Sequence, residues 1–263
     1  MSNQPLKSAW EKRAEEKGNS LSSVLFQGLP DTLNKYIHEF HWKVICNEFL
    51  PHMQQGSTII DLGCGYGRLS YQIKDLRSDL AITGTDFSLN YCQMYRRAVD
   101  TDIVCSDINQ LPFAPCSFDG LIAVTSMMYT DPKSRQDIFK KTMSIVKPGG
   151  YAIFIDPGEE FKKLLSIIKP AIAKRSTGGD GFTSGEYRNL VRETGNKLIN
   201  HGGMPVFSII LPILLLLGNF PNLQKKLLNL IARIDPFLSR LDIFTVHRWM
   251  VIQKNHDSVF SDK

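Results

Sequence analysis

The stretch Ile-Ile-Asp-Leu-Gly-Cys-Gly-Tyr-Gly at residues 59–67 decides the fold of this chain. An apolar run that contains an acidic residue leads directly into three glycines at alternate positions, Gly63, Gly65 and Gly67. Glycine tolerates positive φ and lets a backbone approach a ligand closely, so the pattern predicts a buried strand followed by a ligand-binding turn. A helix expected over residues 68–76 would offer its unpaired N–H groups to the same ligand.

The spacing of these glycines differs from the dinucleotide-binding fingerprint. G-x-G-x-x-G requires a small third residue at position 68, where this chain has Arg68. A second apolar run, residues 80–86, ends in Asp86, nineteen residues after Gly67. A carboxylate there could accept hydrogen bonds from both hydroxyls of a ribose. The two signals together indicate a ligand that carries a ribose.

With these motifs the chain resembles the class I S-adenosylmethionine-dependent methyltransferases over about residues 56–200. The resemblance implies that Asp61–Gly67 wraps the methionine part of S-adenosylmethionine, that Asp86 holds its ribose, and that Phe87 packs on its adenine. Asp107, within the stretch Cys105–Ile108, would reach the adenine amino group. Residues 111–113, 117–119 and 146–150 also resemble family motifs. The cofactor-binding residues so implied are Asp61, Gly63, Cys64, Gly65, Gly67, Asp86, Phe87, Asp107, Ile108, Trp10 and Arg13.

Each acidic residue in this set also has a structural interpretation. Asp61 could cap the glycine turn, and Asp86 could cap a helix that starts after Ser88. Asp107 could belong to an ordinary turn. The Lys-Pro-Gly-Gly sequence at 147–150 is interpreted as a structural turn only.

The alternation of short apolar runs with helical runs predicts an α/β fold with helices on both faces of a sheet. With the resemblance, it predicts a Rossmann-like, doubly wound, mostly parallel seven-stranded sheet with an antiparallel last strand. Strands are expected near 58–61, 81–86, 102–105, 119–125, 151–156 and 248–253. The expected organisation is a helical lid over 1–55, a cofactor-binding core over 56–205, a helical insertion over 206–245, the last strand over 246–254 and a flexible tail over 255–263.

The residues before the glycine motif are helical in tendency and rich in aromatic side chains. Trp10–Ala14 resembles the W-x-x-R-A opening of many such methyltransferases, which implies that Trp10 and Arg13 face the site. An ordinary surface helix packed by one tryptophan is the alternative. A second, amphipathic helix is expected from Asp31.

The insertion is the unusual part of the chain. Val206–Gly218 is almost wholly apolar but too short to span a bilayer, and Pro212 interrupts it. Residues 223–241 mix leucine, isoleucine and phenylalanine with basic residues, and Pro236 is expected to break or restart that helix. Residues 161–254 hold fourteen Lys and Arg against five Asp and Glu. This excess suggests an anionic partner, and the segment could cover the substrate pocket, contact a membrane through 206–241, or form an oligomer interface.

Composition fits a globular enzyme. The 263 residues are 43% hydrophobic and 22% charged, enough for one large α/β domain. Five cysteines without C-x-x-C spacing predict no disulfide framework and no metal site. The polar N-terminus lacks the apolar region of a signal peptide, so a cytoplasmic protein is expected, with peripheral membrane contact as an option.

The predicted reaction is SN2 transfer of a methyl group from S-adenosylmethionine to an oxygen, nitrogen or carbon atom of an anionic or apolar small molecule. Candidate catalytic residues are Tyr129, at the end of the fourth strand, and His38 and His41 on the lid. Enzymes that methylate amino groups of DNA and RNA carry the sequence Asp or Asn-Pro-Pro-aromatic after the fourth strand, where this chain has Ser126–Tyr129. No nucleic-acid partner is therefore expected. Alternatives are a lipid or quinone-like acceptor at a membrane surface, and a non-catalytic cofactor-binding or scaffold protein.

Overall fold

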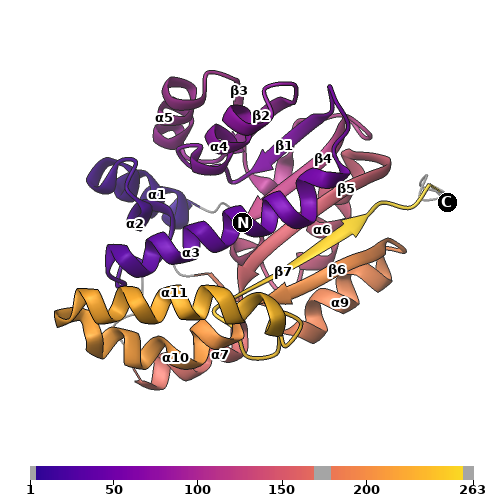
Figure 1. Cartoon of the computed structure of the whole chain (residues 1–263). Helices are drawn as coiled ribbons and strands as arrows, with labels where there is room; N and C mark the ends of the chain where they lie inside the picture. Colours follow the sequence, from indigo (N-terminus) through magenta and orange to yellow (C-terminus); the bar gives the residue numbers. More distant parts are fainter. Residues whose placement is uncertain (1–3, 169–178, 257–263) are drawn as a thin grey trace.

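A single mixed β-sheet forms the centre of the computed structural model, which describes residues 4–168 and 179–256 (Figure 1). Its seven strands lie in the order β3-β2-β1-β4-β5-β7-β6. β7 runs antiparallel to both β5 and β6, and the pairs from β3 to β5 are parallel. The predicted sheet is therefore confirmed. The strands are β1 (Thr58–Leu62), β2 (Ala81–Asp86), β3 (Asp102–Cys105), β4 (Phe118–Val124), β5 (Val146–Pro157), β6 (Lys197–Gly203) and β7 (His247–Gln253).

Two hydrophobic clusters, one built on each face of the sheet, make the fold doubly wound. Helices α6 (Arg135–Ser144) and α9 (Ser184–Glu193) contribute Phe139 and Tyr187 to one cluster. Helix α4 (Arg68–Leu76), at its expected position, and the π-helical turn η1 (Ile45–Phe49) contribute Ile73 and Phe49 to the other. Helix α5 (Leu89–Val99) follows β2.

The N-terminal segment is helical, as expected. It forms α1 (Gln4–Lys17), α2 (Leu21–Val24) and α3 (Asp31–Val44), followed by η1 and a short 3-10 turn, η2 (Leu50–His52). Further 3-10 turns are η3 (Ile108–Gln110) and η4 (Met127–Tyr129), at the ends of β3 and β4. Residues 1–3 of the expected lid and residues 257–263 of the expected tail lie outside the described residues.

The Lys-Pro-Gly-Gly segment is not a separate turn. Strand β5 begins at Val146, which pairs with Phe118, and so includes this segment. Gly149 adopts φ +78° and its N–H donates to the carbonyl of Lys254, while the Lys254 N–H donates to the carbonyl of Gly150. These bonds to the chain beyond β7 hold the glycines in an irregular extension of the strand, where the register with β4 shifts.

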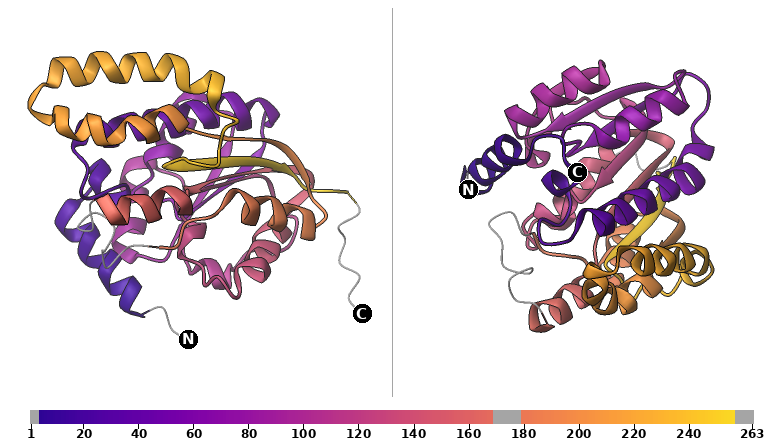
Figure 2. Two further views of the ribbon diagram at one scale, coloured as in Figure 1. Left: turned by 90° about the horizontal axis from the view of Figure 1, so that it is seen from below. Right: turned by 60° about the vertical axis from the view of Figure 1, so that its left-hand side comes forward.

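The insertion forms two antiparallel helices on the outside of the molecule, α10 (Pro205–Leu216) and α11 (Pro221–Leu238), joined by η5 (Leu217–Asn219) (Figure 2). The expected break at Pro236 is wrong, because α11 continues to Leu238. A proline this close to a helix end removes only one hydrogen bond from the final turn. The expected interruption at Pro212 is also wrong, because α10 runs through Pro212 to Leu216.

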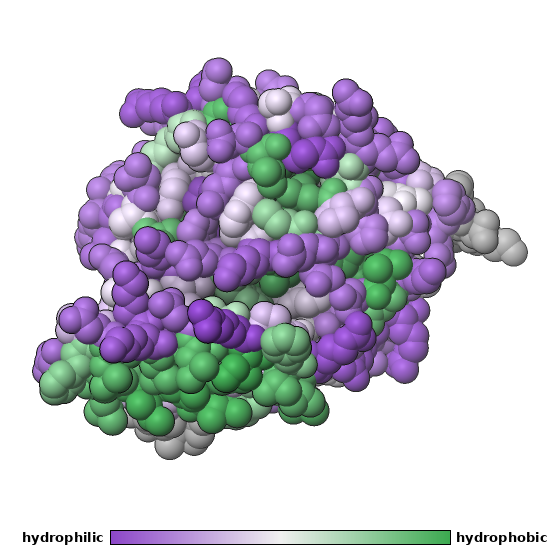
Figure 3. Space-filling view, in the orientation of Figure 1, coloured by the Kyte–Doolittle hydropathy of each residue, from purple (hydrophilic) through white to green (hydrophobic). Residues whose placement is uncertain are grey.

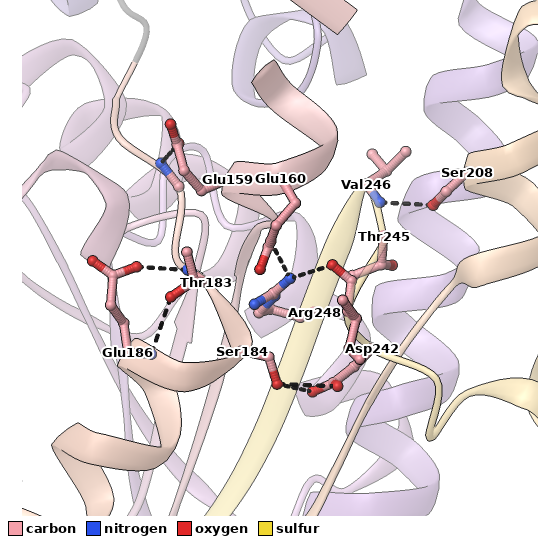
Figure 4. Close-up of polar contacts among 12 residues, drawn as sticks. Glu159, Glu160, Thr183, Ser184, Glu186, Ser208, Asp242, Thr245, Val246 and Arg248 are labelled. Carbon is pink, nitrogen blue, oxygen red and sulfur yellow. Dashed lines mark hydrogen bonds and ion pairs between the residues drawn. The ribbon is translucent and has the colours of Figure 1, made fainter. Parts of the chain in front are cut away.

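Buried polar contacts attach this insertion to the core (Figure 4). Arg248 of β7 is fully buried; its guanidinium pairs with Glu160 of α7 (Glu159–Ile168) at 2.7 Å and donates to the carbonyl of Ile243, at the end of the insertion, at 3.3 Å. The N–H of Val246 donates to the hydroxyl of Ser208 in α10 at 2.7 Å. The insertion is therefore bonded directly to the chain that enters the last strand.

Candidate active site

The glycine loop connects β1 to α4 in the conformation that its sequence predicts. Gly63, Gly65 and Gly67 adopt φ +67°, +55° and +88°. The N–H groups of Gly63 and Cys64 donate to the carbonyl of Thr85, at 2.7 and 3.1 Å, and so tie the loop to the end of β2. A Cβ at Gly63 would lie 2.4 Å from the Ser126 hydroxyl oxygen, so the loop passes too close to β4 for any side chain there.

Asp61 and Asp86 both lie beneath this loop, but in different environments. Asp61 accepts a hydrogen bond from the Ser70 hydroxyl at 2.6 Å and does not line the pocket described below. Asp86 lines that pocket, and its two oxygens accept from the N–H groups of Gly65 (3.0 Å) and Ser88 (2.9 Å). Burial raises the pKa of each carboxyl to about 6. Asp61 therefore bonds β1 to α4 away from the pocket, while Asp86 forms part of the pocket wall.

A pocket opens at the carboxyl ends of β1, β2, β3 and β4, where parallel sheets of this kind bind ligands. Eight of the residues expected at the site line it: Trp10, Gly63, Gly65, Asp86, Phe87, Asp107, Ile108 and Tyr129. A larger cavity of about 1220 Å³ shares Leu6, Phe87, Ser106, Asp107 and Tyr129 with it. Six expected residues do not line the pocket: Arg13, His38, His41, Asp61, Cys64 and Gly67.

Helix α1 lines the pocket through Leu6 and Trp10 and is fastened to the core. Trp10 packs edge-on against Tyr91 at 6.0 Å and Tyr129 at 5.5 Å between ring centroids. Glu11 accepts hydrogen bonds from the Ser88 hydroxyl and from two backbone N–H groups at the start of α5. The lid thus supplies the carboxylate that caps a core helix.

Arg13 holds the N-terminal helices together. Its guanidinium donates to the carbonyls of Ser22 and Leu25, and it lies over the ring of Trp10 at 4.6 Å. The Tyr91 hydroxyl donates to the carbonyl of Ser23 and so holds α2 against α5. These contacts fix the shape of the lid around Trp10.

His38 and His41 share one face of α3, as expected, but they meet Arg68 and not the pocket. The Arg68 guanidinium donates to Nδ1 of His38 at 2.8 Å and to Nδ1 of His41 at 3.0 Å. His41 also bonds to His247 of β7 at 2.7 Å. Burial, together with the charge of Arg68, lowers the pKa of His38 to about 4 and that of His247 to about 3, and burial lowers that of His41 well below its usual range. All three imidazoles are therefore neutral near pH 7.

Several pocket residues have no signal in the sequence motifs. Val24 reaches the pocket from α2, and its side chain would contact a Cβ placed on Gly65 at 2.9 Å. Thr125 follows β4 at φ +55°, a conformation that is costly for a β-branched residue. Such strain concentrates at functional sites. Leu6 and Tyr91 also line the pocket without such a signal, whereas Leu62, Thr85, Ser106, Leu111 and Ser126 lie within stretches that the sequence analysis named, although not as lining residues.

Comparisons with known proteins agree with this geometry. A family model for a methyltransferase domain matches residues 59–150. The chain is 28% identical over 158 residues to O-methyltransferase rstn1 of Aspergillus nomiae, a match that covers 55% of this chain and 66% of that protein. It is 26% identical over 132 residues to the fatty-acid O-methyltransferase of Mycolicibacterium smegmatis, covering 48% of this chain and 45% of that protein. The chain therefore spans less than two thirds of the length of these relatives.

The fold also matches solved structures. Magnesium protoporphyrin IX methyltransferase from Synechocystis PCC 6803, solved with bound SAM, aligns with a TM-score of 0.63 at 9% identity over 96% of each chain. Identity this low demonstrates a common fold alone. Residues 59–150 are therefore similar to a methyltransferase domain, and the whole chain shares its fold with a methyltransferase solved with bound SAM.

Proposed function

We propose that this protein is an enzyme that transfers a methyl group from S-adenosylmethionine to a small-molecule acceptor by SN2 displacement. One observation carries the proposal. The glycine loop, the Asp86 carboxylate and the Phe87 ring line a single pocket at the carboxyl edge of the sheet. This combination supplies a close backbone approach, an acceptor for ribose hydroxyls and an apolar wall for adenine.

The residues present fit the cofactor. Each Asp86 oxygen accepts one backbone N–H, and an ionised carboxylate has about four lone-pair sites, so sites remain for both ribose hydroxyls. Phe87 and Ile108 would enclose the adenine, with Asp107 at its edge. The Trp10 indole N–H is buried with no acceptor among the described residues, and it would donate to the cofactor's carboxylate.

Bound S-adenosylmethionine would supply a methyl group on a positively charged sulfur, which is already a good electrophile. The chain's own contribution is then alignment of the acceptor and exclusion of water. Burial raises the pKa of Tyr129 above its usual range, so its phenol keeps its proton and can donate a hydrogen bond. Tyr129 would therefore position the acceptor, and His38 and His41, bonded to Arg68 away from the pocket, would take no part in proton transfer.

An oxygen acceptor is favoured, because the two relatives described above are named O-methyltransferases. A carboxylate acceptor needs no general base, which suits a pocket whose tyrosine stays protonated. A lipid or quinone-like acceptor at a membrane surface is the second candidate. The exposed apolar side chains of the α10–α11 insertion favour it.

Calorimetry tests the first step of the proposal, which is cofactor binding. S-adenosylmethionine and S-adenosylhomocysteine should both bind, and no heat at millimolar cofactor would contradict the proposal. Binding should also change the intrinsic fluorescence of the protein. That change should disappear in Trp10→Phe and persist in Trp42→Phe and Trp249→Phe, because Trp10 is the tryptophan that lines the pocket.

The ribose assignment is tested with a matched pair of carboxylates. Asp86→Ala should weaken cofactor binding by roughly 1 to 3 kcal/mol, because buried partners are left unpaired. Asp235→Ala is the control, since Asp235 is also buried and also accepts two backbone N–H groups, from Val206 and Phe207, outside the pocket. Equal cofactor affinity in the two variants would refute the assignment of Asp86.

The acceptor class is tested with radiolabelled cofactor. The methyl label should move to a product when the enzyme is offered a long-chain fatty acid, a hydroxylated quinone precursor or a water-soluble phenol. Label in the organic phase with the fatty acid or quinone alone would select the second candidate. No transfer to any acceptor, despite cofactor binding, would favour the scaffold alternative.

A further inference from the structure

The outer face of the α10–α11 insertion is unusually apolar. Fourteen large hydrophobic side chains are exposed among the described residues, and eleven of them lie within residues 209–243. Phe237 is 88% exposed and Leu216 is 80% exposed. Figure 3 shows the apolar residues gathered in one continuous patch over these two helices. The eleven residues are Ile209, Ile213, Leu216, Phe220, Leu223, Leu230, Ile234, Phe237, Leu238, Leu241 and Ile243.

This face is additional to the apolar face that packs on the protein. In α11, Leu228 and Ile231 point inward and join a cluster with Phe207 and Leu211 of α10 and Leu33 of α3. The exposed residues of α11 recur instead at 223, 230 and 237, seven apart, and so form a second stripe along the helix. A contiguous exposed apolar surface of this kind marks an interaction site.

Positive charge borders the patch. Lys226 and Arg233 each follow an exposed apolar residue of the stripe by three positions, which places them about 60° round the helix axis from it, and Arg240 is exposed in the turn after α11. Lys225 adds a fourth exposed cation. The only acidic residue in 205–241 is Asp235, which is buried and accepts hydrogen bonds from the first N–H groups of α10. The exposed charge of the insertion is therefore entirely positive.

We propose that this face docks on an anionic lipid bilayer, with the apolar stripe in the acyl boundary and the four cations against lipid headgroups. A helix with a Leu- and Phe-rich face and Lys and Arg beside it is the pattern that lies in a membrane interface. Within the described ranges, no helix has both the length and the apolar character that crossing a bilayer requires.

The docking face lies on the lid side of the catalytic pocket. The cluster beneath the insertion includes Leu25 and Leu29, which follow α2, and Val24 of α2 packs against this cluster. Val24 also lines the pocket. A protein bound through α10 and α11 would therefore be held by helices that pack directly against the N-terminal segment that lines the pocket.

The experiment is flotation of the full chain with vesicles of phosphatidylcholine, with and without phosphatidylglycerol. The protein should float with the anionic vesicles and only weakly with the neutral ones. Raising the salt from 0.1 to 1 M, which shortens the Debye length from about 10 to about 3 Å, should lower the bound fraction. The double variant Leu216→Gln/Phe237→Gln should lower the partition coefficient at least tenfold, which corresponds to about 1.4 kcal/mol.

A matched control separates docking from a general loss of surface apolarity. Tyr71→Gln/Leu76→Gln removes one aromatic and one leucine of 56% and 58% exposure from α4 and should leave partitioning unchanged. Calorimetric cofactor binding should be unchanged in both double variants, so failure of docking and failure of the proposed function are distinguishable. Three results would overturn the proposal: wild type that stays unbound, equal partitioning of the two double variants, or a concentration-dependent dimer that Leu216→Gln/Phe237→Gln abolishes.

Discussion

Replacing Gly63 by alanine tests the closest approach in the site, between the glycine loop and the end of β4. The new Cβ would lie 2.4 Å from the Ser126 Oγ and 2.9 Å from its Cβ. Ser126 cannot easily move away, because its hydroxyl donates to the carbonyls of Leu62 at 2.6 Å and Val124 at 3.1 Å. The substitution must therefore displace either the loop or the floor of the pocket.

Two costs add in this variant. Alanine at φ +67° costs roughly 1 to 2 kcal/mol, and overpacking a close contact costs typically about 1 to 3 kcal/mol more. Gly195 isolates the first cost, because it has φ +66° and a Cβ added there would meet no atom of the described residues within 4 Å. The expected loss of unfolding free energy is thus about 2 to 5 kcal/mol for Gly63→Ala and about 1 to 2 kcal/mol for Gly195→Ala.

Urea unfolding at constant m-value measures both losses. Ser126→Gly removes both clashing atoms, so the double variant Gly63→Ala/Ser126→Gly should be more stable than the sum of the single losses by about 1 to 3 kcal/mol. Ser126→Ala, which keeps the Cβ at 2.9 Å, should rescue less. The reasoning fails if Gly63→Ala costs no more than Gly195→Ala, or if removing the Ser126 side chain gives no rescue.

Three further substitutions test the lid, the insertion and the histidine cluster. Glu11→Gln should speed hydrogen exchange in α1, because three donors of α5 lose a charged acceptor; unchanged exchange would contradict the capping role. Asp235→Ala should cost about 2 to 4 kcal/mol of stability in urea unfolding, because two N–H groups of α10 lose their acceptor, and a loss below about 1 kcal/mol would contradict this. The folded-state pKa of His38, about 4, is below its unfolded value of about 6.5, so its stabilising contribution is present above pH 6.5 and is lost as the pH falls toward 4. Between pH 6.5 and 4 the wild type should lose about 2 to 3 kcal/mol more unfolding free energy than His38→Gln. The buried aspartates with raised pKa are present in both proteins, so their effect cancels in this difference. Parallel pH profiles of the two proteins would refute the linkage.

The part of the site that lies at strand ends could be predicted from the sequence. Asp86 and Asp107 lie at the ends of short apolar runs, which meet at one edge of a parallel sheet, and the family resemblance added Phe87 and Ile108 beside them. The glycine loop was predictable because three alternate glycines after a strand have few other uses. These signals are local, so a single sequence carries them.

The contributions of the lid depend on contacts that no local pattern encodes. Glu11 reaches α5 across 77 residues of sequence, and Tyr91 reaches Ser23 across 68. The same limit applies to His38 and His41. Their shared helix face followed from spacing, but their partner, Arg68, depends on how α3 packs against α4.

The insertion carries more apolar residues than its packing on the protein buries, and the sequence alone does not show which of them face outward. The sequence of α11 carries two apolar stripes, and either could have faced the protein. Packing resolves the choice, since Leu228 and Ile231 are buried while Leu230 and Phe237 are exposed. One stripe suffices to hold the helix, because Asp235 and Gln224 add buried bonds to α10 from the same side. The second stripe stays exposed among the described residues, which supports the proposed docking on a partner outside the chain, and the cations beside it favour a negatively charged one.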